Sequence, residues 1–120
     1  MGLDMYAMTT TEEVPGAVDF KVEQASEIFY WRKHPNLHGW MQKLYYDKGG
    51  KDDSFNCVPV VLTSEDLDRL EADVKAGHLP DTTGFFFGVS DSREDEDLAF
   101  IAKAREALAA GLTVFYDSWW

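Results

Sequence analysis

One short segment beginning at Tyr30 holds the densest group of recognition side chains in this sequence. It carries two tryptophans, two cations and two histidines, namely Trp31, Arg32, Lys33, His34, His38 and Trp40. Guanidinium and ammonium groups bind anions, and indole rings stack on aromatic or cationic groups. A histidine adds a directional hydrogen bond near neutral pH. The segment therefore predicts either a ligand site or the polar rim of an aromatic core.

Each member of this segment also has a purely structural interpretation. Arg32 and Lys33 are adjacent, so a helix would point them roughly 100° apart, and both could instead neutralise nearby glutamates. His34 and His38 have the spacing of a helical metal pair, but Pro35 interrupts the helix between them. A third ligand at zinc-motif spacing is missing, so we predict no metal, no cofactor and no assigned catalytic residue.

The acidic run near residue 95 offers a second kind of site. Its carboxylates suit a helix N-terminus, where they meet the positive end of the helix dipole. The run lacks the glycine and terminal glutamate of a calcium loop. An alternative hypothesis makes it the charged face of an inhibitor that docks onto a basic groove, through Asp91, Glu94, Asp95 and Asp97.

Composition limits the classes of partner. The chain has 120 residues and a net charge of −11, which fits one domain over residues 1–120 and disfavours broad nucleic-acid or anionic-membrane binding. The single cysteine, Cys57, favours a reducing compartment, and we predict that it is buried. The sequence contains no signal-peptide pattern and no long apolar run, so the expected location is the cytoplasm.

Hydrophobic periodicity predicts an α+β fold: a mainly antiparallel sheet of four or five short strands, with three or four helices on one face. The predicted strands cover residues 3–8, 18–22, 58–62 and 112–116, and residues 83–88 suit a strand or a turn. The predicted helices cover residues 25–33 and 36–46, the stretch from the capping box at 63–66 to Gly77, and the stretch from residue 90 to Gly111. Of the terminal aromatics, we expect Trp119 in the core and Trp120 on the surface.

Four motifs in order resemble a family of small bacteriophage and bacterial proteins. They are Gly2-Leu3-Asp4-Met5-Tyr6, Tyr30-Trp31-Arg32-Lys33 with Leu37-His38-Gly39-Trp40, Gly84-Phe85-Phe86-Phe87-Gly88, and Tyr116-Asp117-Ser118-Trp119. Some members carry a phosphoglycerate kinase label, but this chain is too short for a two-domain kinase and lacks a nucleotide-phosphate loop. The resemblance implies a genomic setting rather than a mechanism, and it singles out Asp4, Tyr6, Trp31, Arg32, Lys33, His38, Trp40 and Ser118.

The sequence thus leads to three functional expectations. The first is a binding module in which the singled-out residues line one hollow and hold a small anionic ligand or a host protein. The second is the acidic inhibitor described above. The third is a small enzyme acting on a phosphorylated or nucleotide-like metabolite, with His38 as general acid or base. The first and third require that residues from both chain ends and the middle of the chain converge.

Overall fold

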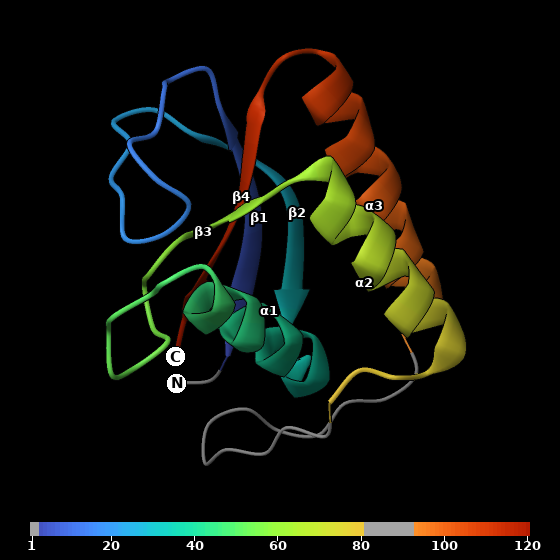
Figure 1. Cartoon of the computed structure of the whole chain (residues 1–120). Helices are drawn as coiled ribbons and strands as arrows, with labels where there is room; N and C mark the ends of the chain where they lie inside the picture. The colour runs from blue at the N-terminus through green and yellow to red at the C-terminus, as the bar shows by residue number, and fades with distance from the viewer. Residues whose placement is uncertain (1–2, 81–92) are drawn as a thin grey trace.

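The strands form one antiparallel sheet, with both chain ends on its two central strands. The computed structural model describes residues 3–80 and 93–120, and within these ranges it has four strands in the order β2-β1-β4-β3 and three helices (Figure 1). The strands are β1 (Asp4–Thr10), β2 (Ser26–Arg32), β3 (Val60–Leu62) and β4 (Thr113–Trp119). The helices are α1 (Pro35–Asp47), α2 (Ser64–Ala76) and α3 (Glu94–Ala109). The predicted α+β architecture is confirmed.

Strand β1 shows why the sheet has two unlike faces. Leu3, Met5 and Ala7 are fully buried, whereas Asp4 and Tyr6 between them are half-buried. Successive side chains of a strand point to opposite faces, so the alternation directs the apolar set toward the helices. The neighbouring strands repeat it in register, because Met5 lies opposite both a buried position of β2 and a buried position of β4. One face is therefore packed on helices, and the other faces away from them.

The predicted helix over residues 25–33 is wrong, because this segment is strand β2. Its run Ile28-Phe29-Tyr30-Trp31 consists of β-branched and aromatic residues, which favour a pleated surface. The predicted strand over 18–22 is reduced to one isolated bridge between Val18 and Val60. Pairing with β1 is thus made by the later segment, and residues 11–25 form the connection between the two strands.

The helix boundaries follow their capping residues. Pro35 begins α1 instead of ending an earlier helix, which suits the fixed φ of proline at a first helical position. Thr63 and Asp66 form the predicted capping box of α2, and Gly77 ends α2 with a left-handed backbone at φ 70°. None of the helices in the described residues is long and apolar enough to cross a membrane.

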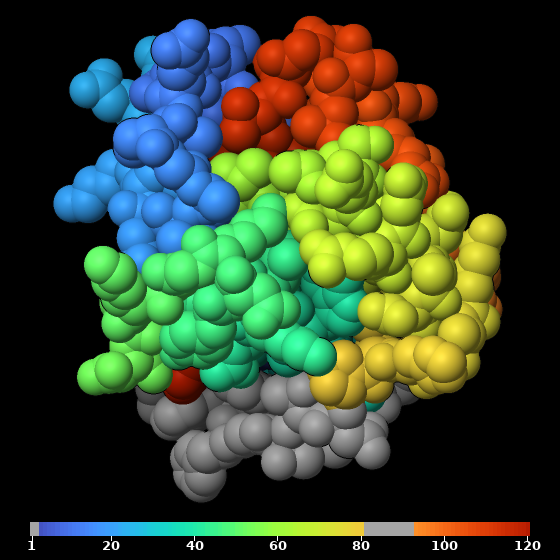
Figure 2. Space-filling view, viewed as in Figure 1, coloured from blue at the N-terminus to red at the C-terminus, as the bar shows by residue number. Residues whose placement is uncertain are grey.

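The main core lies between the sheet and the helices. Its largest buried side chains include Trp31 from β2, Tyr45 from α1, Phe100 from α3 and Tyr116 from β4. Viewed from this side, α1, α2, α3 and the first loop hide most of the sheet (Figure 2). A smaller apolar contact lies on the opposite face, where Phe20 packs edge-on against Phe115 with ring centroids 5.3 Å apart.

Candidate functional site

The sheet divides the residues that the sequence singled out, so they do not share one hollow. Trp31 and Ser118 lie opposite Met5 on the helix-covered face, and His38 of α1 is fully buried against that face. Arg32 and Asp4, which are paired with each other and lie next in sequence to Trp31 and Met5, belong to the other face. The expected convergence of cations, imidazole and indoles is therefore not what the structure shows.

Trp31 and Asp97 belong to a buried polar contact between strand and helices. Both side chains are 2% exposed, and the Trp31 indole N–H donates to Asp97 Oδ1 at 3.2 Å. His34 Nε2 lies 3.0 Å from the other oxygen of the same carboxylate. Asp97 therefore joins β2, the start of α1 and the start of α3, and it is not on the charged surface that the inhibitor hypothesis requires.

His38 and Ser118 belong to a second buried cluster, around the Tyr116 hydroxyl. His38 Nδ1 is 2.6 Å from the Tyr116 hydroxyl, and Phe55 packs on the imidazole with centroids 4.9 Å apart. Burial lowers the pKa of His38 to about 4 and raises the pKa of Tyr116 well above its ordinary value. A histidine that is neutral and enclosed at pH 7 is poorly placed to exchange protons with a substrate.

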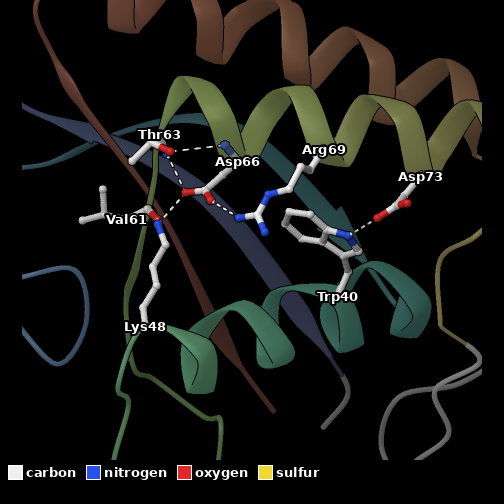
Figure 3. A network of polar contacts seen from close by, with 7 residues as sticks. All are labelled: Trp40, Lys48, Val61, Thr63, Asp66, Arg69 and Asp73. Atoms are coloured by element: carbon white, nitrogen blue, oxygen red, sulfur yellow. Dashed lines mark hydrogen bonds and ion pairs between the residues drawn. The ribbon is translucent and has the colours of Figure 1, made fainter.

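Trp40 and Lys33 have separate structural surroundings. The Trp40 indole donates to Asp73 Oδ2 at 2.8 Å and so joins α1 to α2 (Figure 3). Lys33 has a left-handed backbone at φ 54° in the turn between β2 and α1, and its N–H donates to the Leu3 carbonyl at 2.9 Å. Its side chain is exposed. The partners of Trp40 and Lys33 are therefore different from those of His38.

The same close-up shows how α2 is anchored to β3 and α1 (Figure 3). The carboxylate of Asp66 accepts hydrogen bonds from the Lys48 ammonium, the Thr63 N–H and the Arg69 guanidinium. Burial by itself would raise the pKa of Asp66, but these three donors outweigh it and hold the pKa below its ordinary value. This network is satisfied internally and stabilises the helix layer.

The most exposed recognition side chains lie on the uncovered side of the sheet. We define the open face as Asp4, Tyr6, Tyr30, Arg32, Asp117 and Trp119. In register, Arg32, Asp4 and Trp119 form one row across β2, β1 and β4, and Tyr30, Tyr6 and Asp117 form the next. Trp119 is 66% exposed and Tyr30 is 43% exposed. Two large aromatic side chains are thus exposed to solvent on a regular β-sheet.

Contacts within the open face fix the two tyrosines. The Tyr30 hydroxyl donates to Asp4 Oδ1 at 2.5 Å, and the Tyr6 and Tyr30 rings lie 5.4 Å apart. The hydrogen bond to Asp4 raises the pKa of Tyr30, while burial and then the charge of Asp4 raise the pKa of Tyr6. Both phenols are protonated at neutral pH, and the hydrogen bond to Asp4 orients the Tyr30 ring.

A depression continues from the open face around the edge strand to the start of α3. It encloses about 670 Å³ and is lined by Tyr30, Trp31, Arg32, Arg93 and the exposed acids Glu94, Asp95 and Glu96. Arg93 closes its base by donating to the Arg32 and Lys33 carbonyls at 2.7 and 3.1 Å. Of the predicted acidic face, Glu94 and Asp95 are therefore exposed, whereas Asp91 lies outside the described residues, as does the predicted segment 83–88.

Three further predictions about single residues are wrong. Cys57 is exposed rather than buried. Trp119 is on the surface because Tyr116 and Ser118 face the core, and alternation then sends Asp117 and Trp119 to the other side. Trp120 packs against the core instead, and its indole donates to the Phe55 carbonyl at 2.7 Å. Extending the predicted last strand through Trp119 would have given the correct face for both tryptophans.

We take the open face as the candidate site. In the part of the chain that the structure describes, no group of three or more His, Cys, Asp or Glu side chains is placed to hold a metal ion. The open face offers flat aromatic area and one guanidinium, which are enriched in protein–protein contacts, together with carboxylates, which are depleted in them. Comparisons with protein-family models, with curated proteins and with solved structures found no match to this chain.

Proposed function

We propose that this chain is a protein-binding module whose open face docks onto a basic surface of a partner protein. The observation that carries the proposal is the exposure of Trp119, at 66%, and of Tyr30, at 43%, on one face of the sheet, where β1 with Asp4 and Tyr6 lies between them. Tryptophan, tyrosine and arginine are the residues enriched among those that dominate binding energy, and Arg32 completes that set here. Isolated exposed aromatics are ordinary, but a contiguous group marks an interaction surface.

Charge supports a basic partner. The whole chain carries a net charge of −11, and the open face is bordered by Glu94, Asp95 and Glu96 in the depression beside Tyr30. A potential of this sign speeds the approach of a positively charged surface and discourages acidic competitors. The proposal thus combines the host-protein version of the binding module with the acidic docking of the inhibitor hypothesis. The family resemblance would place such a partner in a bacterial host.

A small anionic ligand is less well supported by the geometry. The described residues do not bring Arg32 and Lys33 together with His38, because His38 is buried on the helix side of the sheet. The depression that does contain Arg32 also contains three carboxylates, which repel an anion. An enzyme that relies on His38 has the same difficulty of access.

The test is affinity capture with matched surface variants. The full chain is used as bait, and captured proteins are identified by mass spectrometry with wild type, Trp119→Ala, Tyr30→Ala and the control Tyr46→Ala. Tyr46 is 40% exposed but lies on α1, away from the open face. We expect a basic protein that is retained by wild type and Tyr46→Ala and is lost, by roughly 30-fold or more in affinity, with Trp119→Ala. Capture that is unaffected by both open-face variants, or the absence of any basic protein, contradicts the proposal.

A further inference from the structure

A cavity of about 370 Å³ adjoins the open face and shares Tyr6 and Asp117 with it. Its floor is formed by Tyr6 and Met8 of β1 and by Phe115 of β4, and Val22 from the first loop forms a wall. Its volume is near the lower end of the range of about 300–1,000 Å³ typical of ligand pockets. Such a cavity is large enough for one long side chain.

Two carboxylates face this apolar floor. Glu27 of β2 and Asp117 of β4 both line the cavity, on opposite sides of the β1 floor residues. Among residues 3–80 and 93–120, neither carboxylate forms an ion pair, although Asp117 Oδ1 accepts the Ser118 N–H at 2.8 Å. Asp117 is half-buried, so its charge without a cation is costly and burial raises its pKa, whereas Glu27 is exposed to water at the mouth of the cavity. The cavity therefore combines apolar walls with uncompensated negative charge.

The wall of the cavity is held in place by the first loop. Glu12 accepts hydrogen bonds from the Glu23 and Gln24 N–H groups at 3.2 and 2.6 Å, and the Thr10 hydroxyl donates to the Gln24 carbonyl at 2.8 Å. Phe20 of the same loop packs edge-on against Phe115, one of the lining residues. The cavity is thus built by the fold before any ligand arrives.

We infer that this cavity takes an alkylammonium group, supplied by a lysine side chain of the basic partner. A lysine has an aliphatic stem that suits Met8, Val22 and Phe115, and a compact ammonium head that suits Glu27 and Asp117. The Tyr6 ring adds a face that attracts a cation. A carboxylate or phosphate ligand is repelled by the same two acids. The inference rests on the proposed function, since it names the side chain through which the partner is anchored.

The first measurement uses n-butylammonium as a probe of the full chain by ¹H–¹⁵N NMR, with n-butanol as the neutral control of equal length. We expect saturable shifts at the amides of Met8, Val22 and Phe115, with a dissociation constant on the order of 1–10 mM. Glu27→Gln and Asp117→Asn should each weaken this constant by roughly tenfold, whereas Glu65→Gln, at an exposed site on α2, should not change it. Shifts that do not saturate, that n-butanol reproduces, or that survive Asp117→Asn overturn the ammonium site.

The second measurement separates this inference from the proposed function. The captured partner is compared on wild type and on the double variant Glu27→Gln/Asp117→Asn, whose folding is checked by its thermal midpoint. Loss of capture, with the probe also lost, supports a lysine anchor. Capture that resists the double variant but is lost with Trp119→Ala overturns the lysine anchor and leaves the open face standing. A third outcome is that Trp119→Ala still captures the partner while n-butylammonium still binds the cavity saturably. This outcome overturns the proposed function, and with it the assignment of the cavity to a lysine of the partner.

Discussion

The two faces of the sheet use similar residue types for opposite purposes. On the covered face, Trp31 and His38 are fully or almost fully buried, and their polar atoms are joined to Asp97 and Tyr116. On the open face, Trp119 and Tyr30 are exposed to water. Tryptophan and tyrosine side chains are therefore buried or exposed according to which face of the sheet they occupy, as Trp31 and Tyr116 against Trp119 and Tyr30 show. The comparison teaches that strand parity, rather than residue type, separates the core from the proposed binding surface here.

The largest effect is expected from Asp97→Ala, which removes the acceptor shared by Trp31 and His34. Two buried donors lose their partner, so the free energy of unfolding should fall by about 3 kcal/mol. Asp95→Ala is the matched control in the same helical turn, and because Asp95 is exposed it should cost less than about 1 kcal/mol. Urea unfolding measures both, and equal effects would contradict the division between buried and exposed acids.

The second effect is the pH dependence that His38 imposes on stability. Its pKa in the folded state is about 4, against an ordinary value near 6.5 in the unfolded chain. Between these values the unfolded state takes up a proton and the folded state does not, so the free energy of unfolding falls as pH decreases, by roughly 3 kcal/mol in total. The lowered pKa of Asp66 acts in a more acidic window, below its ordinary value.

Urea unfolding between pH 7 and pH 4 tests this effect in wild type and in His38→Gln. The glutamine variant cannot titrate in this range, so its slope should be shallower, whatever its stability at pH 7. Identical slopes in the two proteins would show that His38 is not held neutral by burial.

A smaller effect on the free energy of unfolding is expected when two tryptophans, one buried and one exposed, are each replaced by phenylalanine. Trp31→Phe removes a buried indole N–H and leaves Asp97 short of a donor, so it should cost about 2 kcal/mol. Trp119→Phe keeps an aromatic ring at an exposed position and should stay within about 0.5 kcal/mol of wild type. Chemical unfolding gives both values, and a large loss for Trp119→Phe would place that residue in the core after all.

The smallest effect concerns the phenol of Tyr30. Asp4→Asn removes the carboxylate that holds the Tyr30 proton, so the pKa of Tyr30 should fall toward its ordinary value near 10. Ultraviolet titration of the tyrosines, with Tyr30→Phe used to assign the signal, measures the change. An unchanged Tyr30 titration would mean that the pair is not formed in solution.

Much of the fold could be predicted from local sequence. The alternation of Leu3, Met5 and Ala7 gave the buried face of β1, and the Thr63 capping box and Gly77 gave the limits of α2. The β2 segment could not be assigned correctly, because its spacing of apolar residues also fits a helix and only pairing with β1 decides between them.

The candidate site was harder to predict than the fold. Arg32, Asp4 and Tyr6 were singled out and do share a face, but Trp31, His38 and Ser118 lie on the other side of the sheet. Which side a strand residue takes depends on register between β2, β1 and β4, which are far apart in sequence. Asp117 and Trp119 were missed as surface residues because β4 was expected to end at Tyr116.

The most direct test is hydroxyl-radical footprinting of the four tryptophans and of Tyr30, with and without the captured partner. The account predicts that Trp119 and Tyr30 are oxidised in the free protein and protected in the complex, and that Trp31 is unreactive in both. Protection confined to α1 or α2, with Trp119 equally reactive in both states, would contradict it.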